Sequence, residues 1–209
     1  MSQLVFDGVN ILDFGWAIAA PWMVKYLSDH GATVIHVESG THPDIIRTSP
    51  PFKGGQSGVD NSVYWVNYNC NKYGLRLNMK HPRARRLITK LVLWADVVVE
   101  NFAPGVMRKW GFAYEEVRKI KPEVIMISQS QFGQTGPLAF MPGTGVQLTA
   151  YTGFNQLTGW GDRDPSILYG GYTDCPAARY GAVALIAALL YRRRTGKGIY
   201  IDLSQYESG

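Results

Sequence analysis

NILDFGWAIAAPWMVKYLSDHGATVIHVE, residues 10–38, contains two short apolar runs separated by a longer segment. The runs Asn10–Phe14 and Thr33–Glu38 have the length and the β-branched content of strands. Between them, Ala20–His30 has the pattern of a helix. A strand, a helix and a second strand in this order predict a parallel βαβ unit.

The same alternation continues along the rest of the chain. Further strands are predicted at Asp96–Glu100, Val124–Ser128 and Ile199–Leu203. Further helices are predicted at Pro82–Trp94, Tyr114–Ile120 and Ala177–Arg193. We therefore expect an α/β fold, a Rossmann-like parallel sheet with flanking helices. No G-x-G-x-x-G sequence follows the first strand, so the dinucleotide-binding fingerprint is missing.

Two segments rich in glycine, proline and serine interrupt the alternation. Ser39–Asn61 is expected to be a surface loop, and loops of this length within a domain are often functional. Met141–Gly145 is expected to be a second loop, which leads into a helix at Gln147–Tyr151.

The composition is that of a soluble globular protein with a substantial core. Of the 209 residues, 46% are hydrophobic and 18% are charged. No apolar run reaches the ~20 residues of a membrane span, and the N-terminal residues lack the pattern of a secretory signal. Cys70 and Cys175 form neither a disulfide framework nor a metal-ligand cluster, which favours a reducing cytoplasm.

The net charge of +5 admits polyanionic partners. Nucleic acid is not expected, because the sequence has no helix-turn-helix signature, zinc-ligand spacing or RNP motif. Two basic runs, Arg83–Arg86 and Arg192–Lys197, fit solvated helix faces or helix ends. Attraction of a ligand's phosphates is the alternative interpretation of these runs.

One carboxylate, Asp174, ends the glycine-rich segment Gly170–Asp174 where the apolar helix should begin. The two glycines at 170 and 171 allow close approach of the backbone to a substrate. Asp174 can be the N-cap of that helix, with Pro176 near its first position. A helix cap alone and a catalytic carboxylate are both compatible with this pattern.

Six blocks in order along the chain resemble the family III CoA-transferases, the group that includes formyl-CoA transferase and alpha-methylacyl-CoA racemase. The blocks are Asp7–Phe14, Ala20–Glu38, Asn69–Lys80, Val97–Gly105, Phe132–Pro137 and Asp174–Ser208, the last containing RRRTGKG and IDLS. The family's members are considerably longer. The resemblance therefore implies that residues 1–209 form the N-terminal portion of a CoA-binding catalytic domain. The smaller second domain and the C-terminal return of the chain are expected to be absent.

The resemblance implies a role for each matching residue. Asp174 matches the covalent nucleophile of the transferases. The CoA contacts correspond to Ile18, Ala19, Ser39, Leu77, Asn78, Met79, Lys80, Asn101, Phe102, Ala103, Lys109, Gln129, Ser130, Gln131 and Phe132. Lys80 and Lys109 can meet phosphates, and Phe102 offers an aromatic face. Relatives often have arginine at position 39, so one phosphate contact is either lost at Ser39 or supplied by Arg47.

The implied reaction moves CoA from an acyl-CoA to a carboxylic acid through an aspartyl anhydride and an aspartyl-CoA thioester. CoA is then a substrate, and no permanently bound cofactor or metal is needed. The glycine-rich loop that stabilises the oxyanions in the family is expected beyond residue 209. The racemases pair the aspartate with a histidine, and Thr144 stands in that place here, which disfavours proton transfer at an α-carbon.

The resemblance also bears on the acceptor acid and on the assembly of the protein. Oxalate-using relatives have glutamine and tyrosine where this chain has Ile18 and Phe132, which favours a larger apolar or aromatic acid. The sequence YTD…RYGA…YRRRTGKG…IDLSQYES, within residues 172–208, resembles transferases that act on benzylsuccinate-type acids. Such a pocket could be lined by Trp16, Trp22, Trp160 and Tyr172. The resemblance implies an interlocked homodimer or a heteromer at full length. A non-catalytic CoA-binding subunit that completes a partner's site is the remaining alternative.

Overall fold

Six parallel strands form a single sheet in the computed structural model, which describes residues 3–168 and 170–209. The strands are β1 (Asn10–Asp13), β2 (Thr33–Glu38), β3 (Tyr73–Arg76), β4 (Val97–Glu100), β5 (Ile125–Ser130) and β6 (Ile199–Ser204). Their spatial order is β3-β2-β1-β4-β5-β6. This is the order of the doubly wound Rossmann fold, so the predicted fold class is confirmed.

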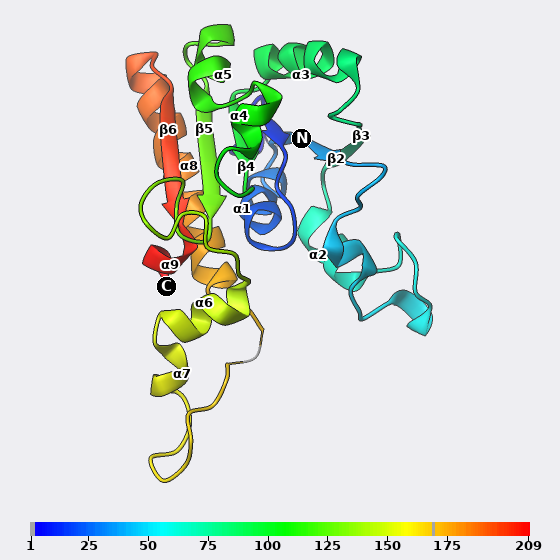
Figure 1. Cartoon of the computed structure of the whole chain (residues 1–209). Helices are drawn as coiled ribbons and strands as arrows, with labels where there is room; N and C mark the ends of the chain where they lie inside the picture. The colour runs from blue at the N-terminus through cyan, green and yellow to red at the C-terminus, as the bar shows by residue number, and fades with distance from the viewer. Residues whose placement is uncertain (1–2, 169) are drawn as a thin grey trace.

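Helices cover both faces of this sheet (Figure 1). The helices on one face are α1 (Ala19–Ser28) and α8 (Asp174–Thr195), and those on the other are α3 (Pro82–Trp94), α4 (Val106–Trp110) and α5 (Tyr114–Ile120). Alternate residues of β4 divide between the two layers: Val97 and Val99 pack with α1 and α8, and Val98 packs with α3. All three are fully buried, and burial of each side chain contributes roughly 1.5–3 kcal/mol.

Short helices gather near the carboxyl ends of the strands. They are η1 (Ile45–Thr48), η2 (Lys53–Gly55), α2 (Val63–Asn69), α6 (Gly145–Tyr151), α7 (Phe154–Leu157) and α9 (Gln205–Ser208). Figure 1 shows α6 and α7 projecting beyond the ends of β5 and β6, with α9 and the last residue close to α6. This end of the sheet therefore carries most of the irregular structure.

The predicted elements are confirmed to within a few residues. Four helices, α2, α4, α7 and α9, were not predicted. The edge strand β3 was not predicted. The loop predicted at Ser39–Asn61 contains η1 and η2, and its Asp44 is buried. The helix predicted from Ala177 begins at Asp174, and its N-cap is Thr173. The predicted N-cap role of Asp174 is therefore wrong.

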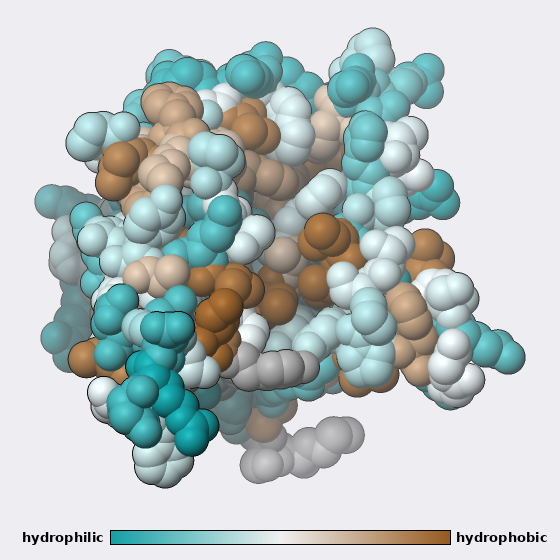
Figure 2. Space-filling model, turned by 60° about the horizontal axis from the view of Figure 1, so that its bottom comes forward, coloured by the Kyte–Doolittle hydropathy of each residue, from teal (hydrophilic) through white to brown (hydrophobic). Residues whose placement is uncertain are grey.

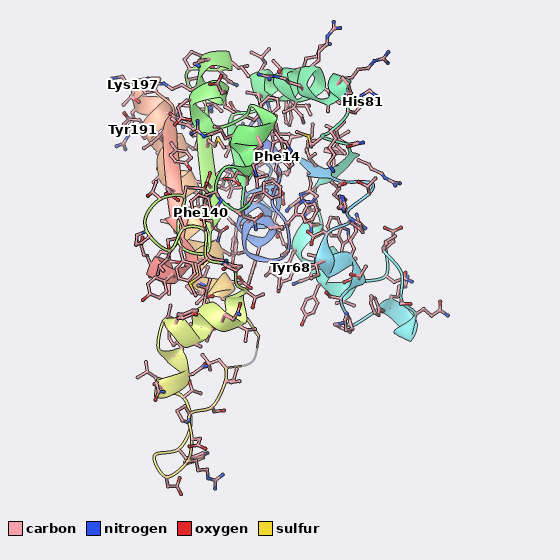
Figure 3. The ribbon with its side chains drawn as sticks, viewed as in Figure 1. Phe14, Tyr68, His81, Phe140, Tyr191 and Lys197 are labelled. Atoms are coloured by element: carbon pink, nitrogen blue, oxygen red, sulfur yellow. The ribbon has the colours of Figure 1, made fainter. Side chains whose placement is uncertain are left out.

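The basic run Arg192–Lys197 lies at the amino end of β6, where α8 ends. Figure 3 shows the labelled Tyr191 and Lys197 at the end of the sheet opposite to α9. Arg192 forms an ion pair with Asp96, with 3.0 Å between nitrogen and oxygen. The run closes a helix end, and its position argues against the alternative that it attracts phosphates to the carboxyl ends of the strands. Among the described residues, no helix combines the length and the apolarity that crossing a bilayer requires.

Candidate active site

The strand order of the sheet reverses between β1 and β4, because the chain runs from β1 to β2 and β3 on one side and from β4 to β5 and β6 on the other. The crevice at this point is the usual place for a ligand in such folds. The Asn101 amide holds this crevice together. Its Oδ1 accepts a hydrogen bond from the Trp16 main-chain N–H at 2.7 Å, and its Nδ2 donates to the Trp16 carbonyl at 2.8 Å. The next residue, Ala17, has a φ of 60°, and its N–H donates to the buried Asp44 carboxylate. Asn101 and Asp44 thus fix the turn that carries Ile18 and Ala19 into α1.

A cavity of about 470 Å³ opens at this crevice. It contains six of the predicted CoA contacts, namely Ser39, Leu77, Asn78, Met79, Lys80 and Phe102. Its walls are largely apolar, because Phe14, Trp16 and Trp110 also line it. Figure 2 shows apolar side chains gathered around the middle of this face, and Figure 3 shows Phe14 in the centre of the molecule. A largely apolar cavity of this size, with Lys80 among its lining residues, is of the kind that binds small molecules.

Two other predicted CoA contacts, Ala103 and Lys109, line a separate hollow of about 630 Å³. The carboxylates of Glu100 and Asp202 also face this hollow. Burial raises the pKa of Glu100 to about 7, although its carboxylate accepts a hydrogen bond from the Phe102 N–H at 2.8 Å. Of the predicted contacts on the β4–α4 segment, Phe102 lines the first cavity, Ala103 and Lys109 line the second hollow, and Asn101 lines neither.

Arg47, the proposed substitute for an arginine at position 39, is already paired with acidic groups. The Arg47 guanidinium donates to both oxygens of Glu38, at 2.5 and 2.7 Å, and to Asp60 at 2.9 Å. It also lies over the Trp65 ring at 3.5 Å. Because these partners occupy its nitrogens, the prediction that Arg47 replaces a missing phosphate contact at position 39 is not supported.

The end of β5 supplies the last predicted group, Gln129–Phe132. Gln129 and Ser130 are 2% and 7% exposed, and neither side chain has a hydrogen-bond partner among the described residues. Buried polar groups are normally satisfied, so these two side chains are exceptions within the described residues. The Gln131 side chain donates to the Gly143 carbonyl, and Phe132 packs against Tyr151 and Tyr206.

Asp174 is the first residue of α8, and its side chain is hydrogen-bonded to a residue of another helix. Its Oδ1 accepts a hydrogen bond from Gln205 Nε2 at 2.9 Å. Burial raises the pKa of Asp174 to about 6, and the hydrogen bond from Gln205 offsets only part of that rise. The carboxyl is therefore more basic than an ordinary aspartate, yet still mostly ionised at pH 7.

Two glycines make room for this carboxyl. A Cβ at Gly145 would lie 2.7 Å from Asp174 Oδ2, and a Cβ at Gly171 would lie 2.6 Å from the same atom. Glycine is required at both positions for the carboxyl to occupy its place. The glycines predicted to let a substrate approach the backbone therefore also let the Asp174 carboxylate pack against it. Tyr169, just before this segment, lies outside the described residues.

Thr144, which stands in the place of the racemase histidine, caps α6. Its main-chain N–H donates to Gln147 Oε1 at 2.8 Å. The four aromatic residues proposed for an acceptor pocket do not come together. Trp16 lines the CoA-sized cavity, Trp22 packs against Tyr68, Trp160 is 74% exposed, and Tyr172 packs on Phe154. Among the described residues, Phe132 and its tyrosine partners are the better candidates.

A buried polar network beneath the crevice was not predicted. Asp13 is fully buried and accepts hydrogen bonds from Lys72 Nζ at 3.0 Å and from the Gly15 N–H at 2.8 Å. His36 Nδ1 lies 2.9 Å from the same carboxylate. Lys72 Nζ also donates to the Pro21 carbonyl and to Asn69 Oδ1. Although burial opposes ionisation, Lys72 and His36 hold the pKa of Asp13 well below its usual range.

Comparison with known proteins places this geometry in a family. The profile of CoA-transferase family III matches residues 6–209. The chain is 37% identical to an acetyl-CoA:oxalate CoA-transferase of Acetobacter aceti, over 97% of this chain and 51% of that protein. It is 34% identical to the beta subunit of a succinyl-CoA–L-malate CoA-transferase of Chloroflexus aurantiacus, over 99% and 50%.

The fold agrees with a solved structure. A CaiB/BaiF family protein from Brucella suis has a TM-score of 0.91 and 34% identity, over 99% of this chain and 55% of that one. The chain spans about half the length of the curated relatives that it matches. The profile covers nearly all of the chain, and the chain belongs to the CoA-transferase family III.

Proposed function

We propose that this chain supplies the CoA-binding crevice and the nucleophile of a CoA-transferase, which moves CoA from an acyl-CoA to a carboxylic acid. The observation that carries the proposal is the Asp174 carboxyl. It is partly buried beyond the carboxyl end of the sheet, it makes no helix cap, and its pKa is raised to about 6. Perturbed carboxyls of this kind are typical of catalytic sites.

The proposed reaction begins at the acyl-CoA thioester. The Asp174 carboxylate attacks the thioester carbonyl carbon, a carbon–oxygen bond forms, and the carbon–sulfur bond breaks to release the CoA thiolate. The thiolate attacks the aspartyl carbonyl of the resulting anhydride and expels the donor acid as its carboxylate. The acceptor carboxylate then attacks the aspartyl-CoA thioester, and the same steps in reverse release the new acyl-CoA. Every proton and electron is accounted for without a further reactant.

The raised pKa fits this role. A carboxylate whose conjugate acid has a pKa of about 6 is more nucleophilic than an exposed aspartate, and it remains ionised at neutral pH. Binding of the CoA arm in the apolar crevice would hold the thioester near the carboxylate, which replaces a bimolecular encounter with a positioned one. The unpartnered Gln129 and Ser130 side chains support a polar ligand group at the end of β5.

We propose an acceptor acid with an apolar or aromatic body. Support comes from Phe132, which packs with Tyr151 and Tyr206 beside the α9 helix that bears Gln205. Ile18, at the start of α1, adds a further apolar side chain at the carboxyl end of β1. Turnover with phenyl-substituted succinates should exceed turnover with oxalate; preference for oxalate would contradict this part of the proposal.

A dimer or heteromer in the cytoplasm completes the proposal. The outer face of α8 presents exposed apolar side chains, with Tyr180 57%, Val183 64% and Leu190 49% exposed. One relative is named as a beta subunit, which keeps a heteromeric assembly open. Cys70 and Cys175 are both free, in keeping with a reducing compartment.

The experiment is the intact mass of the full-length protein after brief incubation with succinyl-CoA. The expected product is an adduct with the mass of CoA less one water, which hydroxylamine removes. Asp174→Asn is the matched control, because it keeps the side-chain volume without a nucleophilic oxygen pair. An adduct that persists in the control, or CoA binding with no adduct in the native protein, would overturn the assignment. The latter result would favour the racemase or the non-catalytic subunit.

A further inference from the structure

Among the described residues, only the side chain of Gln205 donates a hydrogen bond to the Asp174 carboxyl. It lies 31 residues from Asp174 along the chain, and it comes from a different helix. Gln205 is 7% exposed, so the contact is shielded from water. A donor that reaches a candidate nucleophile from another element is well placed to act in its chemistry.

The position of Gln205 is fixed by the end of the sheet. Its predecessor, Ser204, is paired with Ser130 in the β5–β6 ladder. The Ser204 hydroxyl donates to the Gln131 carbonyl at 3.3 Å, and the Tyr206 N–H donates to the same carbonyl at 2.9 Å. Gln205 is thus the first residue of a helix whose start is held by Ser130, the last residue of β5, and by Gln131, which follows it. This anchoring preorganises the amide before any substrate binds.

The two oxygens of Asp174 have different surroundings. Oδ1 receives the Gln205 amide N–H at 2.9 Å, whereas Oδ2 faces the Cα positions of Gly145 and Gly171. No described residue donates a hydrogen bond to Oδ2, which makes Oδ2 the better candidate for the attacking oxygen. Oδ1 is then the oxygen that remains on the aspartyl carbonyl.

Resting on the proposed function, we propose that Gln205 is a catalytic residue, whose Nε2–H donates to Oδ1 when that oxygen becomes an oxyanion. After Oδ2 attacks the donor, Oδ1 is the carbonyl oxygen of the aspartyl anhydride. Attack of the CoA thiolate on Cγ forms the carbon–sulfur bond and moves an electron pair onto Oδ1. Collapse of this intermediate restores the carbonyl and breaks the bond between Cγ and Oδ2. The donor acid leaves as its carboxylate and carries the former Oδ2 with it. Attack of the acceptor on the thioester places charge on Oδ1 again.

The test is rapid-quench kinetics of the full-length protein with succinyl-CoA. The rates measured are those of adduct formation and of adduct discharge by an acceptor acid. Gln205→Leu keeps the approximate shape without a donor, and both rates should fall about a hundredfold, with KM for the acyl-CoA unchanged. Gln56→Ala is the control, because Gln56 is an exposed residue distant in sequence from this contact, and both rates should match those of the native protein.

Gln205→Glu gives a second readout, which a merely structural role would not produce. At neutral pH it places a carboxylate beside Asp174 and should be at least as slow as Gln205→Leu. When the pH is lowered until the two carboxyls share one proton, the protonated carboxyl at position 205 can again donate to Asp174. The rate of this variant should therefore pass through a maximum as the pH falls.

The outcomes separate this inference from the function on which it rests. A native protein that forms no adduct on Asp174 overturns the proposed function. A native protein that forms the adduct, with Gln205→Leu forming and discharging it as fast as Gln56→Ala does, overturns the role of Gln205 alone. Thermal unfolding of each variant accompanies the kinetics, and the Gln205→Glu profile decides the matter if Gln205→Leu does not fold.

Discussion

Asp174 illustrates how one side chain can differ from what its local sequence predicts. Aspartate before an apolar helix is a common N-cap, yet here Thr173 occupies that position and the Asp174 carboxyl meets Gln205. No local pattern reveals a partner 31 residues away. The sequence therefore predicted the importance of Asp174 through its resemblance to a family, and the reason for its raised pKa became visible only in the fold.

The pH dependence of turnover follows from that pKa. Asp174 must be ionised to attack, and its pKa is raised to about 6. We expect the rate to fall tenfold for each pH unit below about 6, because only the ionised fraction reacts. Since the Gln205 hydrogen bond lowers the pKa of Asp174, the acid limb should move to higher pH in Gln205→Leu. A rate profile that is flat from pH 7 to pH 5 would contradict the assignment.

At the scale of elements, β1, β2, β4 and β5 could be predicted because they are largely apolar runs between helices, and β6 could be predicted because its apolar and polar residues alternate. β3 could not, because it is a four-residue edge strand and its Tyr73 is 70% exposed. Most of the predicted CoA contacts lie just beyond strand ends, whereas Ala19 and Lys109 lie in helices, and the contacts divide among the crevice, a second hollow and the end of β5. Sequence order cannot show this division, because side-chain direction decides it.

The start of α6 and the segment before α8 offer a test at this scale. A methyl group at Gly145 or Gly171 would lie within 2.7 Å of Asp174 Oδ2 and must displace it. Gly145→Ala should leave α6 intact, since alanine favours helices, and turnover should fall about a hundredfold through misplacement of the carboxyl. The matched control is Gly161→Ala, where an added Cβ meets nothing within 4 Å. Equal turnover in the two alanine variants would show that the packing is not needed.

Across the whole molecule, the Asp13–His36–Lys72 network joins β1, β2, the end of α2 and the start of α1 beneath the crevice. Its residues are far apart in the sequence, and a single ionisable residue in an apolar strand gives no indication of which residue pairs with it. The one signal in the sequence was that Asp13 and His36 are ionisable residues flanked by apolar residues in predicted strands. Charges buried in this way are stable only when they are paired.

Lys72→Met should therefore destabilise the protein by about 3–5 kcal/mol at pH 7, because it leaves the Asp13 carboxylate buried without its cation. The pKa of Asp13 is lowered in the folded state, so its contribution to stability is present above its ordinary pKa near 4 and is lost as the pH falls further. The difference between native protein and Lys72→Met should accordingly narrow at low pH. Urea unfolding at pH 7 and at pH 3 measures the free energy of unfolding of both proteins. A difference between them that is independent of pH would contradict the ionic character of the network.

The central claim is that Asp174 reacts covalently, and oxygen exchange tests it most directly. The full-length protein is incubated with unlabelled acyl-CoA and an acceptor acid labelled with oxygen-18, and the peptide that contains Asp174 is then weighed. In the proposed reaction one acceptor oxygen bridges the second anhydride and stays on Asp174 when the product leaves. We predict that this peptide, and no other, gains oxygen-18 during turnover. Turnover without label in Asp174 would contradict the account.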